Sequence, residues 1–303
     1  MKICVTGGAG FIGTNFVRYL LEAYECKLTV IDKLTYAGKK ENLDGLDIKF
    51  IQKDICDLTE KDFDDFDFVF HFAAASHVDR SIYEPREFLM SNVFGTVNLL
   101  DLCRKLGVGR FVFVGTDEAY GSVSKPSRED DKIDPSSPYS ASKVSAETFC
   151  NAYYKTFNVP VIITRSSNNF GPYQHEEKFV SKTIINTLKR KKIPIYGTGE
   201  NIRDWIFVRD NCEGIDFISR NGLVGETYNI GGGNQISNID MVHKILSLIG
   251  ASTDLITFVN DRLGHDFEYN LDCWKAHKLG WKPYFNLDDA LIKTIEWYKK
   301  CLK

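Results

Sequence analysis

The stretch that decides the fold is KICVTGGAGFIG, residues 2–13. Lys2–Thr6 predicts a short strand, and an amphipathic helical run follows the glycines. Gly7 permits a tight turn, and Gly10 lets the backbone approach a pyrophosphate that the helix N-terminus attracts. Gly13 lets the helix pack closely on the strand. The stretch therefore predicts the first unit of a dinucleotide-binding fold.

An acidic residue completes this pattern. The second predicted strand, Lys27–Ile31, ends at Asp32, about 20 residues after Gly13, where a carboxylate can bind a ribose 2′-hydroxyl. A 2′-phosphate would be repelled there, which favours NAD over NADP, although the neighbouring Lys33 weakens that argument. Asp54, after the third strand, either reaches the adenine amino group or is a solvated turn residue.

Strands and helices alternate over the first half of the chain, which predicts parallel βαβ units. The expected fold class is α/β, a doubly wound parallel sheet with a smaller C-terminal α/β region. Predicted strands are 2–6, 27–31, 48–52, 67–72, 110–114, 161–164, 194–196, 205–208 and 226–230. Predicted helices are 14–25, 85–107, 141–157, 178–191, 239–249 and 287–301.

The regularity fades after residue 165. We therefore predict a dinucleotide-binding domain over 1–165, which carries the catalytic residues, and a substrate-binding region over 166–303, interleaved with the first. The length of 303 residues suits one large or two smaller domains.

The composition favours an ordinary soluble, cytoplasmic protein. The chain is 43% hydrophobic and 26% charged, with a net charge of −3, so no basic field argues for nucleic acid or an anionic membrane. No apolar run reaches the roughly 18 residues of a membrane-spanning helix. The N-terminus enters a strand directly, which leaves no room for a signal peptide. The eight cysteines form no Cys-x-x-Cys pair, so we expect reduced thiols and no metal.

The first group of candidate catalytic residues lies in the stretch Val114–Gly121. This stretch follows an apolar strand, and open α/β sheets bind ligands at the carboxyl ends of their strands. Here Thr116 precedes two adjacent acids, Asp117 and Glu118. Adjacent acids are often a solvated turn. In a partly closed site, however, neighbouring carboxylates have separated pKa values, so that one holds a proton while the other accepts one.

Tyr139 and Lys143 lie one helical turn apart and share a helix face. A tyrosine with a pKa near 10 is a poor base at neutral pH, and a nearby ammonium group favours the phenolate. We expect the cation of Lys143 and an oxidised nicotinamide to lower the pKa of Tyr139 together. Spacing of this kind also occurs by chance on helices.

Other residues have two interpretations. His71 is a core or supporting residue, and His77 lies in the cleft or orders its loop. Arg203 either clamps a diphosphate or pairs with Asp204. Arg262 and His265 could form a second anchor. The stripe Phe88, Val93, Val97 and Leu100 is core or a dimer face rather than a cofactor site.

These motifs together resemble the extended short-chain dehydrogenase/reductase enzymes, and among them most closely the dTDP-glucose 4,6-dehydratases. The resemblance spans nearly the whole chain. It rests on 6–13, 32–38, 76–81, 116–118, 137–143, 168–173, 196–205, 228–231 and 261–266. The Thr-Asp-Glu triplet combined with Tyr-x-x-x-Lys is its most specific part, because epimerases and decarboxylases of the superfamily lack the acid pair in this form.

The resemblance implies an NAD-dependent lyase of deoxysugar biosynthesis that converts dTDP-glucose to the 4-keto-6-deoxy sugar and water. Tyr139 would take the proton of the 4-hydroxyl as hydride passes from C4 to NAD. Glu118 would remove the C5 proton and Asp117 would protonate the departing 6-hydroxyl. Hydride would then return to C6. Thr116 would bind the 4-oxygen, and Lys143 would bind the nicotinamide ribose.

The resemblance also implies binding residues and a homodimer built through a four-helix interface from helices around 86–106 and 141–157. The NAD-binding residues would be Gly7, Gly10, Phe11, Ile12, Gly13, Asp32, Lys33, Leu34, Thr35, Asp54, Ile55, Phe72, Ala73, Ala74, Ser76, Tyr139, Lys143 and Asn169. The substrate-binding residues would be Ser76, Thr116, Asn168, Lys178, Phe179, Pro194, Ile195, Tyr196, Arg203, Asn229, Asp261, Arg262 and His265.

The chain departs from the family pattern in places. It is shorter, and Leu263, Phe267 and the pair His175-Glu176 differ from the usual residues, so UDP-glucose stays open as a substrate. The alternatives are a UDP-sugar 4-epimerase or another enzyme that forms a 4-keto sugar, and a regulator that binds NAD without turnover. The acids at 117 and 118 argue against the first, and the intact catalytic set argues against the second.

Overall fold

A parallel sheet forms the centre of the molecule. The computed structural model describes residues 1–261 and 263–302, and in this part of the chain seven strands pair in the order β3-β2-β1-β4-β5-β6-β10. All of its neighbouring strands are parallel. The strands are β1 (Lys2–Thr6), β2 (Lys27–Asp32), β3 (Lys49–Gln52), β4 (Phe68–His71), β5 (Phe111–Thr116), β6 (Val161–Ser166) and β10 (Thr227–Ile230).

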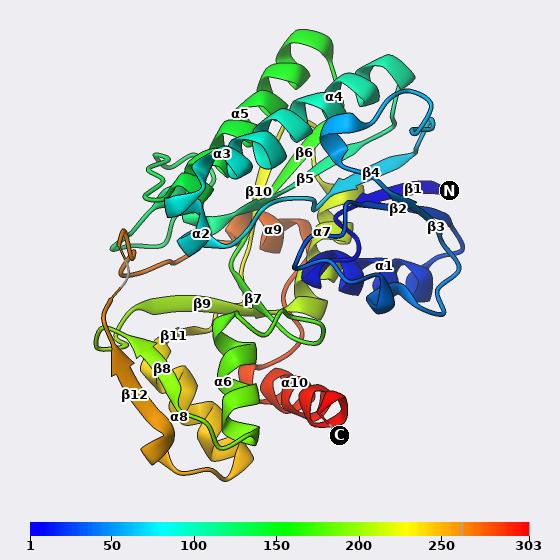
Figure 1. Cartoon of the computed structure of the whole chain (residues 1–303). Coiled ribbons are helices and arrows are strands. Elements are labelled where there is room, and N and C mark those ends of the chain that lie inside the picture. The colour runs from blue at the N-terminus through cyan, green and yellow to red at the C-terminus, as the bar shows by residue number, and fades with distance from the viewer. Residues whose placement is uncertain (262, 303) are drawn as a thin grey trace.

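Helices cover both faces of this sheet, which confirms the doubly wound fold class (Figure 1). α4 (Gly95–Leu106) and α5 (Pro138–Phe157) lie on one face, and α1 (Phe11–Ala23) and α7 (Val208–Asn221) lie on the other. The strand order reverses between β1 and β4, and ligands bind at such a switch point in open α/β sheets.

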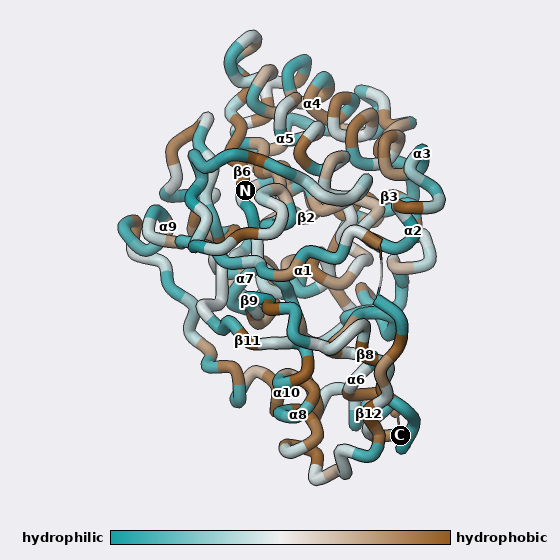
Figure 2. Tube along the Cα trace, turned by 90° about the vertical axis from the view of Figure 1, so that its left-hand side faces the viewer, coloured by the Kyte–Doolittle hydropathy of each residue, from teal (hydrophilic) through white to brown (hydrophobic). Residues whose placement is uncertain are grey.

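Covering both faces explains why the strands read as continuous apolar runs. Successive residues of β5 point to opposite sides, so Val112 and Val114 join the core under α1 and α7, whereas Phe111 and Phe113 join the core under α4 and α5. The turns of α4 and α5 alternate between hydrophobic and hydrophilic residues, as expected for helices with one buried face (Figure 2).

Most of the elements that follow β6 in the chain form the lower part of Figure 1. A mixed sheet contains β7 (Asn168–Phe170), β9 (Ile202–Phe207) and β11 (Gln235–Ser237), and a parallel pair contains β8 (Ile193–Tyr196) and β12 (Ile256–Val259). The helices here are α6 (Phe179–Leu188), α8 (Asn238–Ile249) and α10 (Leu287–Cys301), whereas α9 (Trp274–Leu279) contacts β10 of the main sheet. The chain leaves this region through α7 to add β10 to the main sheet.

Several predicted boundaries are wrong. The helix predicted over 85–107 is divided into α3 (Pro85–Phe88), a π-helical turn at Leu89–Phe94, and α4. The structure also contains α2 (Val78–Tyr83) and α7, which the sequence did not indicate. Val208 begins α7 rather than ending a strand, because β9 stops at Phe207.

Two further findings bear on the composition. No helix within the described residues is both long and apolar enough to cross a membrane. All eight cysteines lie in the described part of the chain and are free thiols, five of them buried.

Candidate active site

The glycine turn forms the base of the site. Gly7 has a φ of +71°, and a Cβ there would lie 2.5 Å from the Ala73 backbone nitrogen on the neighbouring β4 connection. At Gly13 a Cβ would lie 2.2 Å from the Gly7 carbonyl oxygen. Larger residues at these positions would push α1 away from β1. The two glycines thus allow α1 to start close to the end of β1, where the backbone N–H groups of its first turn face the cleft.

Asp32 ends β2 beside this turn. Its carboxylate accepts hydrogen bonds from the backbone N–H groups of Leu34 (2.8 Å) and Ala9 (3.0 Å). Burial raises its pKa despite these two donors. A Cβ at Gly38 would lie 2.9 Å from the same carboxylate, so the returning loop passes close over Asp32.

Asp54 is not a free turn residue. It accepts a hydrogen bond from the Cys56 backbone N–H at 2.9 Å and pairs with Lys33 Nζ at 3.2 Å. Burial acts to raise the pKa of Asp54, but the hydrogen bonds from Cys56 and the pair with Lys33 outweigh it and the net shift is downward. Lys33 is therefore paired within the protein.

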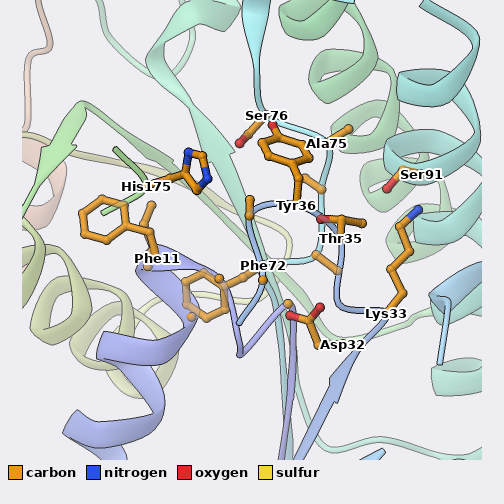
Figure 3. Close-up of a pocket in the computed structure, with 18 of the residues that line it drawn as sticks. Phe11, Asp32, Lys33, Thr35, Tyr36, Phe72, Ala75, Ser76, Ser91 and His175 are labelled. Carbon is orange, nitrogen blue, oxygen red and sulfur yellow. The ribbon is translucent and has the colours of Figure 1, made fainter. Parts of the chain in front are cut away.

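These groups line one elongated pocket of about 210 Å³ (Figure 3). Every residue predicted to bind the cofactor lines it, except Leu34 and Asn169. Leu34 has a φ of +57°, and its side chain packs on the core, so its backbone N–H, not its side chain, contributes through Asp32. Asn169 donates to the Ser167 carbonyl from β7 instead.

The pocket also contains residues that the sequence analysis did not assign to the cofactor. Tyr36, Ala37 and Gly38 continue a stretch already used for the resemblance, so their proximity to Asp32 could have indicated them. Val114 and Gly115 belong to the Val114–Gly121 stretch, whose place at the end of a strand already indicated a ligand site. The others come from elements far apart in the chain, and no local pattern marks them: Lys53, Glu87, Ser91, Gln174, His175 and Glu177.

Helix α5 places Tyr139 and Lys143 against the carboxyl end of β5. It begins at Pro138, earlier than predicted, because Ser137 and Ser140 form a capping box and Pro138 occupies its first turn. Tyr139 and Lys143 both line the pocket. Lys143 Nζ donates to the Val114 carbonyl at 2.7 Å and lies 4.3 Å from the centre of the Phe113 ring.

Thr116 connects the other candidate catalytic residues. It ends β5, and its hydroxyl accepts a hydrogen bond from the Glu118 backbone N–H at 3.3 Å and lies 3.4 Å from an Asp117 carboxylate oxygen. The same side chain is hydrogen-bonded to Tyr139. The structure therefore brings all the predicted catalytic residues together.

The electrostatics separate the two acids. Asp117 is 3% exposed, and burial, followed by the negative charges of Glu118 and Asp204, raises its pKa well above the usual range. Its Oδ2 has no hydrogen-bond partner among the described residues. Glu118 is only half-buried. Asp117 is thus suited to hold a proton, as an acid must.

In the protein alone, Lys143 does not lower the pKa of Tyr139 as predicted. Burial raises the pKa of Tyr139, and the negative charge of Glu118 raises it further, although the Thr116 hydrogen bond acts the other way. Burial lowers the pKa of Lys143 to about 8, and its ammonium group is directed to the Val114 carbonyl. Desolvation therefore outweighs the lysine's effect on Tyr139.

Apart from Ser76 and Thr116, the residues predicted to bind substrate are spread over the C-terminal region. Ser76 and Lys178 line the pocket, and Lys178 Nζ donates to the Ser76 carbonyl at 2.9 Å. Phe179 begins α6 and stacks on Trp205. Asn168 lies on β7 and pairs with Trp205 in the sheet.

Arg203 is 4% exposed, and the structure gives it carbonyl partners rather than Asp204. It donates to the carbonyls of Ile202, Asp266 and Phe267 and lies over the Tyr269 ring. Asp204 instead accepts from the backbone N–H groups of residues 232 and 234. The salt-bridge alternative for Arg203 and Asp204 is therefore wrong.

Asn229 is fully buried, and its side chain is bonded within the protein. It donates to the Ser127 and Asp272 carbonyls and accepts from the Tyr120 hydroxyl. This arrangement favours a structural role for Asn229 over the predicted contact with a diphosphate.

The other predicted substrate residues gather around β8, which carries Pro194, Ile195 and Tyr196. The Tyr196 ring lies against His265, whose Nδ1 is 2.6 Å from Asp261 Oδ1. Ile195 is buried in a small core under α8. Arg262 lies outside the described residues.

The two histidines differ. His71 is fully buried between Thr6 (2.7 Å) and Thr96 (2.9 Å), and burial lowers its pKa to about 3, so it is a neutral core residue. His77 caps α2 and lies half-buried at the pocket edge, beside Glu177.

The family is decided by comparison with known proteins. A family model described as GDP-mannose 4,6 dehydratase matches residues 4–294. The chain belongs to this family.

Its curated relatives agree with the predicted resemblance. A dTDP-glucose 4,6-dehydratase from Streptomyces antibioticus is 43% identical over 99% of this chain and 92% of its own length. The low-salt glycan biosynthesis protein Agl12 of Haloferax volcanii is 44% identical over 98% of both chains.

Solved structures of this family superpose closely. The dTDP-glucose 4,6-dehydratase DesIV from Streptomyces venezuelae, crystallised with NAD bound, is 41% identical, covers 99% of this chain and 97% of its own, and gives a TM-score of 0.97. A UDP-glucose 4-epimerase from Thermotoga maritima, 31% identical with full coverage, gives 0.95. Fold alone therefore does not separate dehydratase from epimerase, and the site residues must do so.

Proposed function

We propose that this protein is an NAD-dependent hydro-lyase that converts dTDP-glucose to the 4-keto-6-deoxy sugar and water. The observation that carries the proposal is the pairing of a buried acid with raised pKa, Asp117, with the half-buried Glu118, both connected through Thr116 to Tyr139. Oxidation at C4 alone needs no such acid–base pair, whereas removal of water across C5 and C6 does.

The pocket suits NAD. The glycine turn lets α1 pack directly against β1, so that the first turn of α1 lines the pocket, and Asp32 lines the same pocket with a carboxylate suited to ribose hydroxyls. Because Lys33 is paired with Asp54, it does not offset the repulsion that Asp32 would exert on a 2′-phosphate. Bound NAD supplies the hydride acceptor for C4, the hydride donor for C6 and a positive charge beside Tyr139.

The residues of the chain supply the proton transfers. Tyr139 accepts the proton of the 4-hydroxyl, while Thr116 hydrogen-bonds the 4-oxygen. Lys143 binds the nicotinamide ribose and contributes its charge. Once C4 is a ketone, the C5 proton is acidic and Glu118 removes it. Asp117 then gives its proton to the departing 6-hydroxyl, which leaves as water.

The nucleotide diphosphate belongs to the C-terminal region. We assign it to Lys178, Arg203 and the group around Tyr196, Asp261 and His265, with Arg262 as a further candidate. Leu263 and Phe267 are exposed near this group, so they are the residues to change in a study of base selectivity.

We further propose a cytoplasmic homodimer. The helical layer of residues 85–106 and α5 exposes Leu89, Met90, Phe94 and Phe149, each more than 40% accessible. A row of exposed large apolar side chains on adjacent helices is typical of an interface. The free thiols suit a reducing compartment.

A product assay tests the proposal. The protein is incubated with dTDP-glucose and, separately, UDP-glucose, and the products are identified by mass and NMR. We expect a 4-keto-6-deoxy sugar nucleotide, formed faster from dTDP-glucose. A 4-epimer would support the epimerase alternative, and NAD-bound protein that forms no product from either sugar would contradict the dehydratase.

A further inference from the structure

The carboxylate of Glu177 joins three segments at the edge of the cofactor pocket. Its Oε2 lies 3.4 Å from His77 Nε2 and 3.6 Å from Arg80 Nη2, both from the start of α2. His77 Nδ1 accepts the Arg80 backbone N–H, so the neutral ring carries its proton on the nitrogen that faces Glu177. The side chains of His77 and Glu177 are 21% and 20% exposed, so water screens their contact less than a surface pair, whereas the Arg80 side chain is 46% exposed.

Tyr36 brings in the third segment, the loop after β2. The Arg80 guanidinium lies 3.7 Å from the centre of the Tyr36 ring, and His175 meets the same ring edge-on at 5.6 Å. Burial, followed by the negative charge of Glu177, raises the pKa of Tyr36 to about 12, so the phenol stays neutral beside the carboxylate. Tyr36 and His175 lie next to each other at one side of the pocket (Figure 3).

This cluster forms part of the pocket wall. Tyr36, His175 and Glu177 all line the pocket, and Figure 3 shows Tyr36 and His175 on the other side of it from Asp32. The segment that carries Glu177 is anchored at its other end, where the Tyr298 hydroxyl of α10 donates to the Gln174 carbonyl at 2.5 Å. A dinucleotide held in the pocket would therefore be enclosed between a fixed base and a wall that Glu177 holds to α2 and to the Tyr36 loop.

We propose that Glu177 is a positioning residue: it holds the start of α2 and the Tyr36 loop in place at the edge of the pocket, and thereby slows the release of bound dinucleotide. The inference rests on the proposed function, because that reaction returns NAD to its starting state and needs no exchange between turnovers. A single carboxylate that contacts separate segments can hold them together, because removing its charge weakens all of these contacts at once. An isolated ion pair on the surface contributes little to stability by comparison.

The test measures NAD release from the purified protein loaded with NAD. The complex is diluted into excess apo-dehydrogenase as a trap, and NAD remaining on the protein is quantified over time by chromatography. We expect Glu177→Gln to release NAD about tenfold faster than the wild type, which corresponds to about 1.4 kcal/mol. The matched control is Glu176→Gln, the same change at the adjacent exposed residue, which should release NAD at the wild-type rate.

Two further measurements distinguish the proposed effect on NAD release from a general loss of stability. The melting temperature of the NAD-free protein and the KM for the sugar nucleotide should be the same in Glu177→Gln and the wild type. Arg80→Gln, at an exposed side chain, is the second variant and should also accelerate release. Wild-type release rates in both variants, or equal acceleration by Glu176→Gln, would overturn the inference even in an active dehydratase. Failure of the dehydratase proposal would instead appear as wild-type protein that binds NAD but forms no product.

Discussion

Asp117 and Glu118 are neighbours in the sequence, yet the structure gives them different surroundings. Asp117 is buried beside Asp204, and Glu118 is half-buried. This difference supports the proposed roles of Asp117 as the acid and Glu118 as the base. Sequence reasoning located the pair because it follows a strand directly, but the assignment of roles by burial required the folded structure.

The role of Glu118 has a spectroscopic consequence. Glu118→Gln should still allow oxidation at C4 but should slow elimination by about 10²–10⁴-fold, the usual contribution of a general base. NADH absorbance should therefore build up when substrate is added and decay slowly. No build-up, with turnover near normal, would remove Glu118 as the base.

Tyr139→Phe is the matched control for that experiment. It removes the group that accepts the 4-hydroxyl proton, so the first oxidation itself should slow by about 10²–10⁴-fold and no NADH should accumulate. Substantial NADH formation in this variant would show that another group accepts the proton.

Lys143 predicts a pH-dependent stability. Its pKa is about 8 in the folded protein and 10.5 as the ordinary value, so the unfolded chain binds more protons between these pH values and stability rises with pH there. Relative to Lys143→Met, the NAD-free wild type should gain about 2 kcal/mol between pH 7 and 9.5. Urea unfolding of both proteins measures this, and a constant difference would contradict it.

At the scale of elements, helix α5 carries both Tyr139 and Lys143, and a buried ion pair fixes it to β6. Arg165 binds Glu147 with two nitrogens, Nη2 at 2.5 Å and Nε at 3.1 Å, and both side chains are at most 5% exposed. Arg165 also donates to the Tyr120 hydroxyl, two residues after Glu118.

Arg165→Met should therefore destabilise the protein by about 3–5 kcal/mol, because it leaves the Glu147 charge buried without its partner. The double variant Arg165→Met/Glu147→Met should recover most of this loss, since a well-packed apolar pair avoids the desolvation cost. Urea denaturation of the variants measures both effects. Simple additivity of the two substitutions would show that the pair is not coupled.

The sequence predicts an element and its position well where short-range motifs determine the local structure. The glycine turn and Asp32 lie in short stretches whose geometry a dinucleotide requires, and the structure places them as expected. Helix α5 begins three residues before the predicted start at residue 141, because the Ser137–Ser140 capping box sets its N-terminus. Pocket residues such as His175 and Glu87 were missed for a different reason, because tertiary packing alone brings them to the cofactor site.

The whole molecule presents the helical layer of residues 85–106 and α5 on one side (Figure 1). If this layer is the dimer interface, Phe94→Glu should yield monomers, because Phe94 is 51% exposed and a charge there would be buried in the dimer. Light scattering during size-exclusion chromatography measures the mass. Tyr284→Glu is the control, because Tyr284 is exposed and its backbone N–H is bonded to Asp210 of α7, on the other face of the sheet. A wild type that is already monomeric would contradict the dimer.

In the proposed reaction one site oxidises C4, removes water across C5 and C6, and reduces C6. The most direct test supplies dTDP-glucose with deuterium at C4 and locates the label in the product by NMR. We predict a 4-keto-6-deoxy sugar with the deuterium at C6 and a solvent proton at C5. Deuterium retained at C4 of a sugar that has lost no water would contradict the account.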